Sequence, residues 1–148
     1  MRSFKRIALF VPRGTAFGRA TISGIGRYCV RQRRDWLFTV NSVLSPARIN
    51  AAGRYFDGIV AATTSRAMAA ALDKCPRPCV NVSAAPAEQL PTVRSDFRAA
   101  GAAGARYLIT RVFTQLAFYG SPFGNASRML DAGFSRLARQ AGITCRIF

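Results

Sequence analysis

The residues best suited to binding chemistry stand beside apolar runs of the sequence. Guanidinium groups donate several hydrogen bonds, an aromatic ring offers a flat apolar face, and hydroxyl and carboxylate oxygens accept hydrogen bonds. The six candidates are Arg13, Phe17 and Arg19 after the first apolar run, Ser83 and Ser121 after two later runs, and Asp96 before a helical pattern. These residue types predict the binding of a polar ligand.

Each candidate also has a plainer interpretation. Phe17 and Arg19 are equally consistent with an ordinary loop that holds a solvent-exposed arginine, and Arg13 is a weaker candidate than either. Asp96 precedes a helical pattern, so it fits a helix N-cap, a role that is compatible with ligand contact. Ser83 and Ser121 are included because they end apolar runs.

Several catalytic chemistries are excluded by composition. The chain has no histidine, which rules out Cys/His zinc sites, Ser-His-Asp triads and Cys-His dyads. Only six acidic residues remain as general acids or bases, so we expect no enzyme, no metal and no cofactor. Cys75 and Cys79 have three residues between them, and with Cys29 and Cys145 we expect reduced, mostly buried thiols. A redox or metal role is the alternative.

The charge is strongly positive. Twenty-two basic and six acidic residues give a formal net charge of +16, which alone suggests nucleic acid or another polyanion as a partner. Nearly all the basic residues are arginines spread along the whole chain, and the one dense cluster is Arg31, Arg33 and Arg34. Dispersed surface charge is therefore the favoured interpretation. A polyanion groove, or an acidic partner or domain, stays open.

Apolar runs alternate with amphipathic segments along the chain. The expected strands are Arg6–Val11, Leu37–Val40, Gly58–Ala62, Cys79–Val82, Gln115–Tyr119 and Thr144–Phe148. Helical patterns separate them, and this alternation predicts βαβ units in a parallel sheet with helices on both faces and a strand order beginning 2-1-3. Ligands of such sheets bind at the carboxyl ends of the strands.

The helical segments carry their own start and stop signals. We expect helices over about 18–34, 46–56, 65–72 and 97–111, and a last helix that Gly142 ends. The stretch 84–91 is expected to be a loop, and Trp36 a core residue between the first helix and the second strand. Small residues from Ala100 to Gly104 predict a close approach of the fourth helix to the sheet.

The length of 148 residues suffices for a domain with a real core. No stretch reaches the ~20 apolar residues of a membrane span, and the apolar run after Met1 is too short for a signal peptide. We therefore expect a cytoplasmic protein that does not bind membranes.

Short motifs occur in a specific order along the chain. They are Gly24-Ile25-Gly26-Arg27-Tyr28 followed by Trp36, Phe56-Asp57-Gly58-Ile59-Val60, Leu90-Pro91-Thr92-Val93 with Asp96, Gly101 and Leu108, Ala117-Phe118-Tyr119-Gly120, and Gly133-Phe134. Their order and spacing resemble the sugar-sensing part of xylose-operon-regulator-like transcription factors.

The resemblance implies a type I periplasmic-binding-protein-like fold in which two α/β lobes close over a sugar, here a pentose. It assigns residues 1–112 to the first lobe and 113–148 to the start of the second. Phe17 would stack on the sugar ring, Arg19 and Arg13 would donate to its hydroxyls, Asp96 would accept from them, and Ser83 and Ser121 would line the same cleft. In that family the protein is a homodimer and binds DNA through a C-terminal helix-turn-helix module.

The sequence departs from the family pattern at several positions. Leu130 stands where the family has a sugar-binding arginine, Ala126 replaces a tryptophan, Tyr107 a histidine and Val112 a glycine. Most of the second lobe and the DNA-binding module are not in the sequence, so we expect a fragment or truncated copy with an incomplete fold. A basic, non-specific nucleic-acid-binding module is the alternative function.

Overall fold

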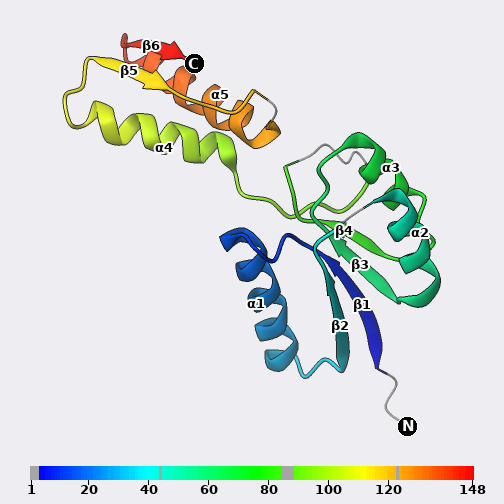
Figure 1. Ribbon diagram of the computed structural model, residues 1–148. Coiled ribbons are helices and arrows are strands. Elements are labelled where there is room, and N and C mark those ends of the chain that lie inside the picture. Colours follow the sequence, from blue (N-terminus) through cyan, green and yellow to red (C-terminus); the bar gives the residue numbers. More distant parts are fainter. Residues whose placement is uncertain (1–3, 44, 85–88, 123) are drawn as a thin grey trace. The chain divides into compact units, whose positions relative to one another are not determined.

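Strands and helices alternate through residues 4–43, 45–84, 89–122 and 124–148, which are the residues that the computed structural model describes (Figure 1). The elements are β1 (Lys5–Phe10), α1 (Ala16–Arg31), β2 (Trp36–Asn41), α2 (Pro46–Tyr55), β3 (Gly58–Ala61), α3 (Arg66–Asp73), β4 (Cys79–Asn81), α4 (Phe97–Ile109), β5 (Gln115–Phe118), α5 (Asn125–Gln140) and β6 (Thr144–Ile147). The loop expected at 84–91 includes residues 85–88, which lie outside the described residues.

The chain forms two compact units, Met1–Arg94 and Ser95–Phe148. The first contains a four-stranded parallel sheet in the order β2-β1-β3-β4, which confirms the predicted order 2-1-3. The second contains a parallel pair, β5 and β6. The division therefore lies after Arg94, whereas the family resemblance implies a boundary after Val112.

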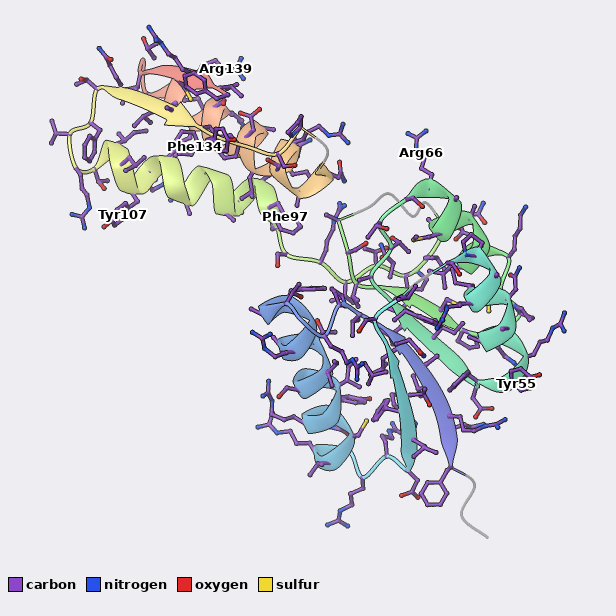
Figure 2. All side chains as sticks on the ribbon, in the orientation of Figure 1. Tyr55, Arg66, Phe97, Tyr107, Phe134 and Arg139 are labelled. Carbon is purple, nitrogen blue, oxygen red and sulfur yellow. The ribbon has the colours of Figure 1, made fainter. Side chains whose placement is uncertain are left out.

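The earlier boundary has a clear packing cause. α4 packs against α5, and the side chains of Ala105 in α4, Phe134 in α5 and Leu116 in β5 share one apolar cluster (Figure 2). A Cβ on Gly101 would meet the carbonyl oxygen of Leu130 in α5. The small residues of α4 thus allow a close approach to a helix, α5, and not to a sheet as expected.

Helices cover both faces of the first sheet. Ala8, Phe10 and Ile59 point to the face where α2 and α3 pack, while Ile7, Leu9 and Val11 point to the face of α1. This alternation follows from the two-residue period of a strand and accounts for the unbroken apolar run from Ile7 to Phe10 in β1, which is buried on both sides.

The predicted helix signals act as expected. Ser45 and Ser65 accept hydrogen bonds from the backbone N–H groups of Arg48 and Met68, and Pro46 occupies the first turn of α2. Gly142 follows α5 with a φ of +70°, the left-handed conformation that glycine adopts at helix ends. None of the described helices is long and apolar enough to cross a membrane.

Candidate functional site

The carboxyl ends of the four parallel strands meet at one edge of the first sheet. Residues that follow them there include Ser42 after β2, Arg13 after β1, Thr63 after β3 and Ser83 after β4. This is the edge at which open α/β sheets bind ligands. We call it the carboxyl edge.

The start of α1 is held tightly against the loop after β1. Thr15 caps the helix: its Oγ1 accepts a hydrogen bond from the Gly18 N–H (3.0 Å) and donates one to the Pro12 carbonyl (2.9 Å). Gly18 is buried, and a Cβ there would meet the Pro12 oxygen, so only glycine allows this contact. Phe17 and Arg19 consequently lie in the first turn of α1, and the expectation that they belong to the loop is wrong.

Both arginines are oriented by neutral oxygen acceptors at the carboxyl edge. The Nε of Arg13 donates to the Ser42 hydroxyl (3.2 Å), and the Nη1 of Arg19 donates to the Gly14 carbonyl (3.0 Å). Each bond uses one of the five N–H donors of a guanidinium. Phe17 is 49% exposed, which leaves much of its ring accessible. The structure thus places two cationic donors and an aromatic ring around one loop.

Ser83 belongs to a polar network, centred on the buried Asn81, that was not predicted from the sequence. Asn81, which is fully buried, accepts hydrogen bonds at Oδ1 from the Ser83 hydroxyl (2.8 Å) and from the Thr63 hydroxyl (3.1 Å). The hydroxyls of Thr63 and Ser83 are also 3.0 Å apart. The available signal was a lone amide in the otherwise apolar run from Cys79 to Val82. The network holds Ser83 in place rather than leaving it loose at the surface.

The network also fixes the chain that leaves the first unit. The Asn81 N–H donates to the Pro91 carbonyl, and the Val93 N–H donates to the Asn81 carbonyl, both at 2.9 Å. The Nδ2 of Asn81 lies 3.4 Å from the Thr92 hydroxyl. Residues 91–93 therefore pair with the end of β4 like a short additional strand.

Asp96 and Ser121 belong to the second unit. Asp96 caps α4 by accepting a hydrogen bond from the Ala99 N–H (2.9 Å), so the N-cap interpretation is confirmed. Ser121 is exposed after β5 and lines a hollow of about 270 Å³. Ser127, Arg128 and Asp131 of α5 line the same hollow and were not predicted from the sequence.

The site contains no arrangement typical of a metal centre. Among the described residues, no three His, Cys, Asp or Glu side chains are grouped as metal ligands. The side chains of the carboxyl edge are hydrogen-bond donors, acceptors and one aromatic ring. This arrangement suits the binding of a polar ligand that both donates and accepts hydrogen bonds.

No protein-family model matches the sequence, and no curated protein sequence is significantly similar to it. Solved structures do share its fold. One is a LacI family transcriptional regulator from Enterococcus faecium with bound ribose, at 20% identity and a TM-score of 0.77, which covers 97% of this chain and 56% of its own. A periplasmic binding protein/LacI transcriptional regulator from Alkaliphilus metalliredigens, complexed with D-xylulofuranose, has 17% identity and a TM-score of 0.74, with coverages of 97% and 56%.

A third similar structure comes from a transport system. It is an ABC transporter periplasmic solute binding protein from Actinobacillus succinogenes with bound D-allose, at 15% identity and a TM-score of 0.77, covering 97% of this chain and 57% of its own. The chain thus spans little more than half the length of these proteins. It has the parallel-sheet α/β fold of LacI-family regulators and periplasmic binding proteins.

Proposed function

We propose that this chain is the sugar-binding part of a bacterial transcriptional regulator of sugar catabolism, with a pentose as the ligand. The observation that carries the proposal is the carboxyl edge of the first sheet, where Phe17, Arg13, Arg19 and Ser83 combine a stacking face with oriented donors and a hydroxyl. Ribose, D-xylulofuranose and D-allose are bound by proteins of the same fold.

In this proposal Phe17 stacks on the sugar ring, and the guanidinium groups of Arg19 and Arg13 donate to its hydroxyls. Ser83, held by Asn81, adds a hydroxyl at the same edge. The family resemblance assigns Asp96 and Ser121 to the same ligand, and both residues lie in the second unit. Signalling then follows from population shift, because the sugar binds the closed form better than the open form.

The second unit lacks one hydrogen-bonding group that the family resemblance leads us to expect. Leu130 stands at the position of the arginine, and its backbone carbonyl is packed against Gly101 at the crossing of α4 and α5. Each hydrogen bond lost from a binding site costs roughly 0.5–1.5 kcal/mol. The isolated chain should therefore bind pentoses only weakly, with dissociation constants in the millimolar range or above.

Weak binding is best followed by NMR. Titration of the ¹⁵N-labelled chain with ribose, xylose and xylulose should shift the backbone amides of residues 14–19 and of Ser83 in a saturable way. Phe17→Leu should abolish these shifts, because it removes the stacking ring but keeps an apolar side chain. Arg19→Gln should weaken them.

Arg27→Gln is the matched control, since Arg27 lies on the same helix, is exposed and donates only to the Ser23 hydroxyl among the described contacts. This variant should leave the titration unchanged. Shifts spread evenly over the chain, or none at the highest soluble sugar concentrations, would show that the carboxyl edge does not bind sugar.

A further inference from the structure

Two of the four cysteines lie side by side in the first unit. Cys79 begins β4 and is buried in the apolar cluster that it shares with α2 and α3, and the half-buried Cys75 packs against the same cluster. Burial raises the pKa of Cys79, and the charge and the hydrogen bond of the Cys75 thiol raise it further. The two thiols are therefore in contact in the folded chain.

The segment between the two thiols is held in place by several contacts. Pro76 and Pro78 fix two of its backbone φ angles. The Nε of Arg77 donates to the Gly53 carbonyl (3.2 Å), and the Arg77 carbonyl accepts a hydrogen bond from the Cys79 thiol (3.2 Å). The positions of the sulfurs are thus fixed by the fold before any ligand binds.

Gly53 of α2 leaves room for the pair. A Cβ there would lie only 3.0 Å from the Cys75 sulfur, so a larger residue would press on the thiol. The Arg77 guanidinium bonds to the carbonyl of the same glycine and brings a positive charge near the sulfurs, while Asp73 acts on Cys79 with a negative charge. These neighbouring charges have opposite signs, so the binding of a cation depends on the sulfurs themselves.

The number of donors decides which cation such a pair can bind. Among the described residues, no group of three His, Cys, Asp or Glu side chains could hold a metal ion, so the pair has no third ligand of these types. Structural Zn(II) sites need four ligands, and Ca(II) and Mg(II) need a shell of oxygens. Cu(I) prefers soft thiolates and is satisfied by two of them. The pair therefore selects Cu(I) from these cations.

A disulfide is the other chemistry open to adjacent thiols, and burial disfavours it. Thiol–disulfide exchange needs a thiolate as the attacking group, and the folded chain keeps Cys79 protonated. Cu(I) needs no preformed thiolate, because a metal ion displaces the thiol protons as it binds. Cation binding is thus favoured over oxidation at this pair.

We propose that Cys75 and Cys79 form a two-coordinate site for Cu(I) in the first unit. Each thiol loses its proton to water and forms one sulfur–copper bond, while copper stays in the +1 state and no electron is transferred. The product is one Cu(I) ion held by two thiolates, with a net charge of one negative unit. The site lies at the amino end of β4, apart from the carboxyl edge.

Titration of the reduced chain with Cu(I) under argon, against bicinchoninate as a coloured competitor, tests the site. The double variant Cys29→Ala and Cys145→Ala keeps only the pair and should withhold one equivalent of Cu(I) from the competitor. At about pH 6.5, where free thiols are protonated, binding should release two protons for each copper ion. Zn(II) should bind at least about a hundredfold more weakly, because two of its four ligands are missing.

Single variants assign the copper to the pair. Cys75→Ala should no longer withhold one equivalent of Cu(I), because one of the two ligands is removed. Its matched control is Cys145→Ala, at another half-buried cysteine, and this change should leave the titration unchanged. Circular dichroism checks that both variants fold.

Alkylation of the parent chain tests the site without any substitution. Cys75 and Cys145 are both half-buried, so iodoacetamide should label each of them in the free protein. One equivalent of Cu(I) should protect Cys75 and leave Cys145 reactive, which peptide mass spectrometry measures. Equal protection of both thiols, an undiminished titration of Cys75→Ala, release of fewer than two protons, or binding of Zn(II) as tight as that of Cu(I) would overturn the proposal.

Discussion

Asn81 joins several segments at the end of the first sheet. It is fully buried, and its side chain joins Thr63, Ser83 and Thr92 while its backbone pairs with residues 91–93. A buried polar group that loses its partners costs much more than a surface one, since water cannot replace them. This residue therefore stabilises both the fold and the position of Ser83.

We expect Asn81→Leu to lower the free energy of unfolding by roughly 1–3 kcal/mol, because it removes the acceptor of the buried Thr63 hydroxyl and the half-buried Ser83 hydroxyl at nearly constant volume. Urea unfolding followed by circular dichroism measures the effect. Asn50→Leu is the control, at an exposed position of α2, and should change stability by less than about 0.5 kcal/mol. Equal effects at both positions would mean that the network contributes nothing.

The cysteines were expected to be mostly buried and reduced, and the structure agrees in part. Cys29 and Cys79 are buried, Cys75 and Cys145 are half-buried, and all four are free thiols. Burial raises the pKa of Cys79 to about 12, with a further contribution from the neighbouring Cys75. Burial also raises the pKa of Cys29, against the opposing charge of Arg34.

These pKa shifts predict slow thiol chemistry in the folded protein. A variant that keeps only Cys79 should react with Ellman's reagent about a hundredfold more slowly at pH 8 than the same variant in urea, since the thiolate is the reacting form. A variant that keeps only the half-buried Cys145 is the comparison and should react faster when folded. Similar rates for the two folded variants would contradict the burial of Cys79.

The sign of the pH effect on stability follows from the same shift. The folded pKa of Cys79 lies above its unfolded value, so the folded state keeps the proton where the unfolded state releases it. The contribution of Cys79 to the free energy of unfolding is fully present below the unfolded pKa and is lost as the pH rises toward about 12. Cys79→Ala should therefore flatten the alkaline fall in the unfolding free energy relative to the parent chain.

At the scale of elements, the second unit depends on two helices that cross at glycines. A Cβ on Gly101 would meet the Leu130 carbonyl, and a Cβ on Gly133 would meet the Arg98 carbonyl. The contact partners are backbone atoms of the opposite helix, which cannot rotate away as a flexible side chain can. The crossing therefore has no room for even one methyl group on either helix.

Gly101→Ala should destabilise the second unit by about 1–3 kcal/mol, because α4 must move away from α5 to admit the methyl group. Gly104→Ala is the control on the same helix, where the nearest atom to a new Cβ is in the Phe134 ring at 3.8 Å. That change should raise stability by roughly 0.5–1 kcal/mol through helix propensity. Amide hydrogen exchange in residues 97–140 reports the local effect, and equal exchange in both variants would contradict the close crossing.

The sequence predicted the elements well where local signals determine them. Apolar runs located β1 to β6, and Ser45, Ser65 and Asp96 marked helix starts because their side chains bind the first free N–H groups. It failed where the outcome depends on a distant partner. The glycines of α4 fit a close approach to a sheet or to a helix, and only the fold shows that the partner is α5.

The candidate site could be predicted only as a set of loops. The order of the parallel strands brings Arg13, Ser83 and the start of α1 to one edge, and this followed from the βα alternation. The hydrogen bonds that orient these residues could not be predicted from that alternation. Ser42, the partner of Arg13, is far from it in the sequence, and Asn81, the partner of Ser83, lies inside an apolar run. The helical position of Phe17 depends on the Thr15 cap, and a threonine three residues before Gly18 is the sequence signal for it.

At the scale of the whole molecule, the net charge of +16 must affect any polyanion nearby. The described elements nevertheless contain no helix-turn-helix. A strand lies between each described helix and the next, so no two consecutive helices form a helix-turn-helix. Charge without a base-reading element gives attraction to phosphates but no sequence discrimination.

We therefore expect the chain to bind duplex DNA at low salt without sequence preference and to release it as salt rises. Counterions displaced from DNA phosphates make the logarithm of the affinity fall linearly with the logarithm of the salt concentration. Gel shifts with two unrelated duplexes of equal length, from low salt to about 0.15 M, should show the same loss of affinity for both duplexes. Replacing Arg31, Arg33 and Arg34 by serine should reduce the slope for both duplexes equally, because these residues form the densest basic cluster. If one duplex stayed bound at the highest salt while the other did not, the chain would contain a sequence reader, and nucleic-acid recognition would replace sugar binding as its function.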